Sequence, residues 1–109
     1  MKVRLQKGSI TIRLLEEEIY TLQHNHQLTE HFGWPSVFPL KGFVLELHES
    51  ADISTRADQG YIYIYLPAAV IKRWQGKHYD SLRDVVAVSE GLPLSLLIEK
   101  DLLPKKGRE

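Results

Sequence analysis

Three tyrosines occupy alternate positions in residues 61–66, where they are interleaved with isoleucine and leucine. Alternate residues of a β-strand point to the same face, so the phenol rings stand together if the aliphatic residues fill a core. Such a row of rings combines apolar area with polar tips, a composition favoured in interfaces and sugar sites. We therefore expect Tyr61, Tyr63 and Tyr65 to form a binding surface. Packing of the rings onto neighbouring strands is the alternative.

A second candidate surface lies in residues 34–40, where two prolines enclose large apolar side chains. Prolines interrupt a β-ladder, so this segment is expected to be a loop. Trp34 and Phe38 then form an apolar prong that contacts a partner or completes a homodimer. The alternative is that the loop folds back as a plug on the end of the fold.

Basic residues form the third candidate group. Lys2, Arg4, Arg13 and Arg56 alternate with apolar residues, which places them on the polar faces of strands. Arg13 belongs to the face of the first half that corresponds to the tyrosine face of the second half. If these charges lined a barrel they could grip a phosphate. Solvated charge on the outer faces of the strands is the alternative.

Three histidines follow the first expected helix, at positions 24, 26 and 31. Imidazole nitrogens are ligands for Zn²⁺, Ni²⁺ and Cu²⁺, and His24 and His26 share one face of an extended segment. His31 is an odd number of residues from His26, so a bend is needed to bring all three together. These histidines are the metal-site candidates, with three surface imidazoles as the alternative.

The composition excludes several classes of function. The 109 residues carry 14 basic and 14 acidic side chains, so no net charge attracts nucleic acid or an anionic membrane. There is no cysteine for a disulfide, a thiol nucleophile or a thiolate metal site. No glycine-rich phosphate loop and no nucleophile elbow occurs. We therefore expect a non-catalytic chain without a cofactor, although an enzyme with charges inside a barrel stays an alternative.

Hydrophobic periodicity predicts the elements that position these residues. Period-2 alternation on both sides of Gly8 predicts a hairpin, and helical spacing behind Glu16, Glu17 and Glu18 predicts a short helix. The expected strands are residues 2–6, 9–14, 28–34, 43–47, 53–59, 61–66, 84–89 and 94–101, and the expected helices are residues 15–23 and 68–75.

The two halves of the chain resemble each other. A shift of 52 residues aligns Gly8 with Gly60 and Arg4 with Arg56, and the later strands need one more residue of shift. Shared patterning alone is the rival explanation. We predict an α+β, predominantly β fold of two ββαββ units related by a pseudo-twofold axis. Because neither unit can bury a core alone, they should merge into a closed or nearly closed antiparallel barrel with two short helices.

Motifs along most of the chain resemble a family of small bacterial proteins of unknown function. The motifs are Lys2-Val3-Arg4-Leu5, Ser9-Ile10 with Arg13-Leu14, Glu30-His31-Phe32-Gly33, Leu66-Pro67, Trp74 and Leu97-Ile98-Glu99-Lys100-Asp101. The sequence departs from the family in the histidine-rich segment and in the loop of residues 34–40. The resemblance implies a stand-alone domain in the bacterial cytoplasm and assigns no catalytic residue.

The sequence thus predicts one domain over residues 1–103, with repeats 1–50 and 51–103, and a disordered tail over residues 104–109. The N-terminus lacks an apolar run of signal-peptide length, which favours the cytoplasm. We expect an interaction or ligand-binding module that uses an aromatic strand face to bind a protein or small ligand, with a homodimer as an option. Metal binding and phosphate binding are the alternatives.

Overall fold

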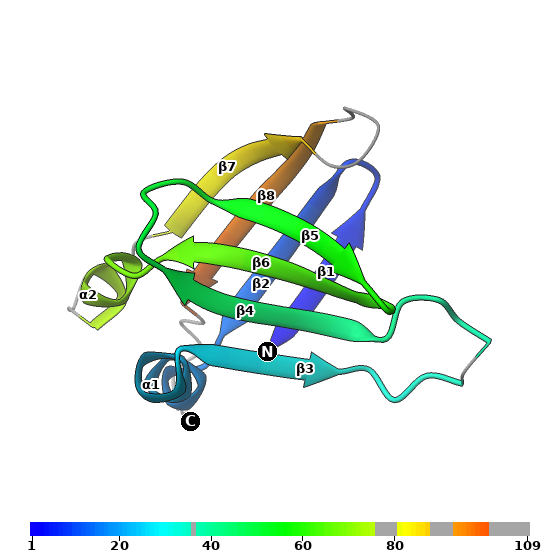
Figure 1. Cartoon of the computed structure of the whole chain (residues 1–109), viewed down its shortest axis with the longest axis horizontal. Helices are drawn as coiled ribbons and strands as arrows, with labels where there is room; N and C mark the ends of the chain where they lie inside the picture. The colour runs from blue at the N-terminus through cyan, green and yellow to red at the C-terminus, as the bar shows by residue number, and fades with distance from the viewer. Residues whose placement is uncertain (36, 76–80, 88–92, 101–109) are drawn as a thin grey trace, which may run out of the picture.

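The computed structural model describes residues 1–35, 37–75, 81–87 and 93–100 of the chain. Figure 1 shows two sheets packed face to face, with both helices at one end and the loop after β3 at the other. The elements are β1 (Lys2–Gln6), β2 (Ser9–Leu14), α1 (Glu16–Asn25), β3 (Gln27–His31), β4 (Gly42–His48), β5 (Ser54–Asp58), β6 (Tyr61–Pro67), α2 (Val70–Gln75), β7 (Ser81–Ala87) and β8 (Pro93–Lys100).

Each sheet has four strands and a parallel pair at its centre. The first sheet has the order β1-β2-β8-β7 and the second has the order β3-β4-β6-β5. The central pairs β2–β8 and β4–β6 are parallel, whereas the outer pairs are antiparallel hairpin partners. Each helix carries the chain from one sheet to the other, because α1 joins β2 to β3 and α2 joins β6 to β7.

The expected mostly β fold with two short helices is confirmed, but the expected closed antiparallel barrel is wrong. Among the described residues no ladder joins the two sheets, and each sheet ends in edge strands. The helical crossovers explain the difference. They deliver the second hairpin of each half to the other sheet, where parallel pairing takes the central position.

The core lies between the sheets and under the helices. The inward residues of the central strands are almost completely buried, and the helices close the core with Ile19, Leu22, Val70, Ile71 and Trp74. The inward residues of β2, β4, β6 and β8 are Ile10, Ile12, Leu14, Phe43, Leu45, Ile64, Leu66, Leu96 and Ile98. Because no backbone ladder joins the two sheets in the described part of the chain, hydrophobic burial is the main interaction that holds them together.

Local signals explain the first helix. The Glu18 carboxylate accepts a hydrogen bond from the Leu15 backbone N–H at 2.8 Å, so an acidic residue of the first turn closes the N-terminus. At the other end His26 adopts the left-handed conformation, with a φ of 63°, and its N–H donates to the Leu22 carbonyl. Neither helix in the described part of the chain has the length and apolarity needed to cross a bilayer.

Several predicted elements differ from the structure at their ends; β7, for example, begins at Ser81 and not at position 84. The third strand ends at His31 and not at position 34, because Gly33 turns the chain with a φ of 72°. The predicted tail, residues 104–109, lies outside the described residues.

Candidate functional site

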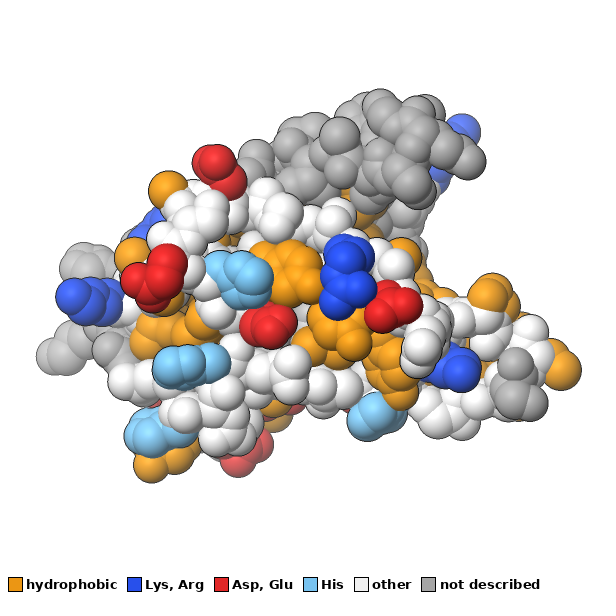
Figure 2. Space-filling model, viewed as in Figure 1, with side chains coloured by type: hydrophobic (Ala, Val, Ile, Leu, Met, Phe, Trp, Pro, Cys, Tyr) orange, Lys and Arg blue, Asp and Glu red, His pale blue; other side chains and the backbone are white. Residues whose placement is uncertain are grey.

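The tyrosine row lies on the outer face of the second sheet. Ile64 and Leu66 of β6 are buried, whereas Tyr61, Tyr63 and Tyr65 are partly exposed. Figure 2 shows this face with hydrophobic, basic, acidic and histidine side chains side by side over β4, β5 and β6. The face is therefore amphipathic and carries both signs of charge.

Each tyrosine contacts a polar or charged residue of another strand of the sheet. The Tyr61 hydroxyl is 2.7 Å from His31 Nδ1, and the His48 ring lies 4.4 Å from that of Tyr65. The Arg56 guanidinium lies over the Tyr63 ring, 4.4 Å from its centroid. These contacts are the cross-strand packing that the sequence left open as an alternative. Arg56 covers one face of the Tyr63 ring, and all three tyrosines stay partly exposed.

Arg56 is held in place on this face, on the edge strand β5. Its Nε donates to the Tyr65 hydroxyl at 2.9 Å, and its Nη1 donates to the Asp58 carboxylate at 3.2 Å. The hydrogen bond to Tyr65 raises the pKa of the Arg56 guanidinium, Asp58 raises it further, and desolvation acts in the opposite direction. Arg56 therefore stays charged, and its charge is compensated within the face.

The loop after β3 is anchored at its base. The Phe32 N–H donates to the Lys41 carbonyl at 3.0 Å, and the Lys41 N–H donates to the Gly60 carbonyl at 2.7 Å. The Phe38 N–H donates to the Pro35 carbonyl within the loop. Gly60 has a φ of 90°, and a Cβ on it would lie 2.7 Å from the Pro39 carbonyl oxygen. The loop is thus fixed against the β5–β6 turn, where only glycine fits.

This anchoring builds an aromatic pocket of about 250 Å³ between the loop and the edge of the tyrosine face. Trp34 and Phe38 come from the loop, and His31 and Tyr61 come from β3 and β6. The Trp34 and Phe38 ring centroids are 5.8 Å apart, and these side chains are 47% and 49% exposed. The structure therefore brings one predicted tyrosine together with both predicted loop residues.

Sequence reasoning missed two members of the aromatic pocket, His31 in this role and Lys41. His31 was a metal candidate, and its position on the outward face of β3 is set by its pairing with Gly42. Lys41 is an ordinary surface lysine in the sequence. Its place beside the aromatic rings follows from the backbone hydrogen bond to Gly60. No local sequence pattern predicts that hydrogen bond.

The three candidate metal ligands lie on different elements. His24 belongs to α1 and its Nδ1 is 2.9 Å from the Tyr20 carbonyl oxygen, His26 caps that helix, and His31 contacts Tyr61. Within the described ranges, no group of three or more His, Cys, Asp or Glu side chains is placed to hold a metal ion. The bend after His26 therefore does not gather the three imidazoles.

Lys2, Arg4 and Arg13 lie on the outer face of the first sheet, so the alternative in which such charges line a barrel is wrong. The inward positions between them are apolar, and Ile10, Ile12 and Leu14 fill the core. Arg13 Nε donates to the Glu99 carboxylate of β8 at 2.6 Å. Because the two sheets do not close, these residues line no enclosed interior in the described part of the chain.

The fold and the site define a mostly β protein of two mixed sheets with an aromatic pocket at one edge. The chain belongs to DUF7009, a family of unknown function whose model matches residues 1–105. The family relationship expected from the sequence motifs is thus confirmed at this level. The chain has no match among the curated proteins and none among the solved structures.

Proposed function

We propose that this chain is a non-catalytic interaction module that binds an acidic protein segment through the aromatic pocket. The observation that carries the proposal is the exposure of Trp34 and Phe38 on a loop whose backbone is fixed beside a cavity of about 250 Å³. Exposed aromatic side chains on a rigid support are typical anchors of protein interfaces. Val37, which is 81% exposed at the same loop, extends the apolar area.

The size of the pocket favours one side chain over a larger ligand. Its volume accommodates a leucine or a phenylalanine together with part of its backbone. The rings of Trp34 and Tyr61 offer apolar walls, and the Tyr61 hydroxyl and the His31 imidazole offer polar contacts at the rim. A bulky apolar residue of the partner is therefore the expected anchor.

The charge around the pocket favours an acidic sequence beside that anchor. Lys41 lines the pocket and is exposed, and the described lining residues include no aspartate or glutamate. A carboxylate next to the anchoring side chain would pair with the Lys41 ammonium at the rim. Such a rim pair adds to the association rate and to specificity more than to affinity.

Tryptophan fluorescence tests this proposal, because Trp34 lines the pocket and the other tryptophan, Trp74, is buried. The probe is the peptide acetyl-Gly-Asp-Phe-Asp-Gly-amide, with Asp-Ala-Asp and Lys-Phe-Lys versions as controls. We expect saturable binding of the first peptide, with Kd of about 1 mM or below, and at least tenfold weaker binding of both controls. Equal affinity for all three peptides contradicts the proposal.

Two variants locate the binding in the pocket, with NMR titration as the readout. Trp34→Ala should weaken binding about 30-fold, which corresponds to about 2 kcal/mol. Tyr20→Ala is the matched control, because Tyr20 is a 62% exposed aromatic residue on α1, at the other end of the sheet. Equal losses in both variants refute the assignment. Dimerisation would also refute the assignment. If the mass in solution doubles at high protein concentration in the wild type but stays that of a monomer in Trp34→Ala, the pocket binds a second copy of the chain.

We also propose that residues 1–103 form one cytoplasmic domain made of two duplicated ββαββ units, residues 1–50 and 51–103. The strand order β1-β2-β8-β7 becomes β5-β6-β4-β3 when each strand is replaced by its counterpart in the other half. The pairing of Arg4 with Thr11 corresponds to that of Arg56 with Tyr63.

A circular permutant tests the duplication. The chain is opened between positions 50 and 51, and Lys100 is joined to Lys2 by five residues, the length of the native connection between β4 and β5. If the halves are equivalent, the two connections span the same distance and the permutant folds with native circular dichroism. A permutant that folds only with a much longer linker contradicts the duplication.

A further inference from the structure

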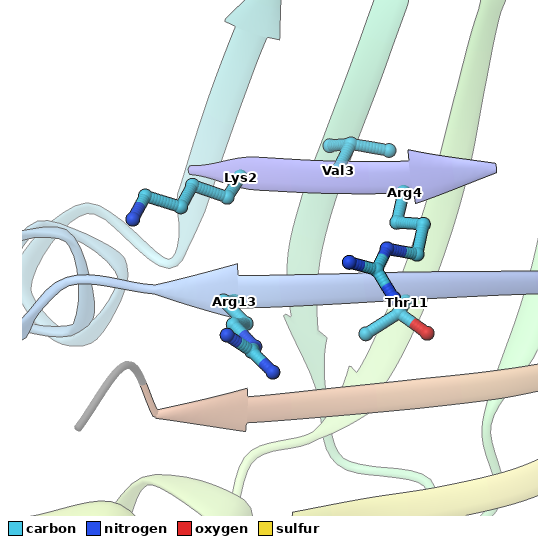
Figure 3. A pocket seen from close by; sticks show the side chains of 5 residues that line it. All are labelled: Lys2, Val3, Arg4, Thr11 and Arg13. Atoms are coloured by element: carbon cyan, nitrogen blue, oxygen red, sulfur yellow. The ribbon is translucent and has the colours of Figure 1, made fainter. Parts of the chain in front are cut away.

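The outer face of the first sheet carries a hollow that the proposed function does not use. It has a volume of about 230 Å³ and is lined by Lys2, Val3, Arg4, Thr11 and Arg13 (Figure 3). Figure 3 shows the Arg4 and Arg13 side chains from neighbouring strands reaching over this face beside Thr11. Three of the five lining residues are cationic and none is acidic.

Arg4 occupies the same place in its hairpin as Arg56 does in the other sheet. Arg4 stands opposite Thr11 in the β1–β2 pair, and Arg56 stands opposite Tyr63 in the β5–β6 pair. Arg56 is covered from one side by the Tyr63 ring and is paired with Asp58, two residues further along the strand. In the second sheet, the arginine at this position therefore has both an aromatic ring beside its guanidinium and a carboxylate as its ion-pair partner.

The first sheet lacks both partners. Thr11 replaces the tyrosine ring with a small hydroxyl side chain, and position 6, two residues after Arg4, is glutamine instead of aspartate. Within the described ranges of the chain, the Arg4 side chain makes no hydrogen bond or ion pair. The loss of the ring opens the hollow, and the loss of the carboxylate leaves Arg4 without the ion pair that Arg56 makes with Asp58. Because of these two differences, the arginine of the first sheet lies in an open cationic hollow, whereas the arginine of the second sheet is packed against its partners.

Arg13 supplies the wall on the other side of Thr11. Its Nε donates to Glu99 at 2.6 Å, which holds the guanidinium in place, and its side chain is 50% exposed. Lys2 stands opposite Arg13 in the hairpin register. Glu99 pairs with Arg13 beside the hollow, and the five lining residues themselves carry three cationic groups and no carboxylate.

We propose that this hollow binds the phosphate group of a small organic phosphate monoester. Guanidinium groups donate paired hydrogen bonds to phosphate oxygens, and the Thr11 hydroxyl offers a further donor from the floor of the site. A volume of about 230 Å³ holds a phosphate and a few further atoms, which favours a small molecule over a polymer. The zero net charge argues against a nucleic acid, which would need positive charge over a longer surface.

Titration calorimetry at constant ionic strength tests the site, with phenyl phosphate and inorganic phosphate as probes. We expect one phenyl phosphate per chain, with Kd of about 1 mM or below and at least fivefold weaker binding of inorganic phosphate. Arg4→Ala should weaken the binding of phenyl phosphate at least tenfold. The matched control is Arg56→Ala, which removes the equivalent arginine of the other sheet and should leave the affinity within twofold.

A second variant closes the site without removing a basic residue. The double substitution Gln6→Asp and Thr11→Tyr copies the partners of Arg56 onto Arg4, and it should abolish the binding of phenyl phosphate. Circular dichroism of each variant checks that it is folded. Equal losses in Arg4→Ala and Arg56→Ala, unchanged binding in the folded double variant, or no saturable heat with the wild-type chain each overturn the proposal. Equal affinity for inorganic phosphate overturns the assignment to an ester.

Discussion

Replacing Tyr63 by serine measures how much the outer face of the second sheet contributes to folding. Tyr63 lies under the Arg56 guanidinium, and its ring centroid is 6.3 Å from that of Tyr65. It also stands beside Val44, which is only 4% exposed although it is on the outer face. The substitution removes the ring from all three neighbours and leaves the buried residues of β6 unchanged.

The expected loss follows from these contacts. A cation–π contact at an exposed site is worth about 0.5–1 kcal/mol, and an aromatic pair about 0.5–1.5 kcal/mol. With the cover of Val44 included, we expect Tyr63→Ser to lower the free energy of unfolding by about 2 kcal/mol. Arg56→Ala should lower it less, and the double variant should reveal a coupling of about 0.5–1 kcal/mol between the two residues.

Urea unfolding followed by far-ultraviolet circular dichroism gives these free energies without relying on tryptophan. With a denaturant slope of about 1.5 kcal/mol per molar, a loss of about 2 kcal/mol moves the midpoint down by about 1.3 M. Tyr20→Ser is the matched control, because Tyr20 is 62% exposed on α1, and its midpoint should move by less than about 0.3 M. Two results together would refute stabilisation by cross-strand packing. The midpoint of Tyr63→Ser would lie as close to that of the wild type as the control does, and the double variant would show no coupling to Arg56.

Two further substitutions test the inner structure, with thermal unfolding as the measurement. Gly42→Ala places a Cβ 2.0 Å from the Glu30 carbonyl oxygen on the neighbouring strand, so it should destabilise the fold by about 3 kcal/mol and lower Tm by about 12 °C or more. An unchanged Tm would contradict this close approach of β3 and β4. Leu45→Ala removes a side chain that is fully buried and should cost about 2–5 kcal/mol, whereas Leu5→Ala, at a site 48% exposed, should cost less than about 1 kcal/mol. Equal losses at the two leucines would contradict the assignment of Leu45 to the core.

Part of the candidate site was accessible from the sequence. The alternation around Tyr61 indicated which side chains point outward, and the prolines at positions 35 and 39 indicated a loop, although they left open whether its aromatic rings are exposed or fold back onto the end of the fold. The contact between them was not predictable. Tyr61 and His31 are 30 residues apart, and they meet because β4 brings β3 and β6 into one sheet.

The difference between the Arg4 and Arg56 positions was likewise not predictable from the sequence. The sequence aligns Arg4 with Arg56, and both were expected on polar strand faces. Whether each is covered depends on the residue across the hairpin and on the carboxylate two positions further on. Those neighbours became interpretable once the registers of the β1–β2 and β5–β6 pairs were known.

By itself the sequence determined the local elements, because hydrophobic periodicity and turn residues act over a few positions. It placed the β1–β2 hairpin around Gly8, whose φ is 74°, and the inward faces of β2 and β6. The tertiary structure alone decided that β2 pairs with β8 and β4 with β6, so that two open sheets form instead of a barrel. Period-2 alternation identifies the buried face of a strand and carries no information about which distant strand lies beside it.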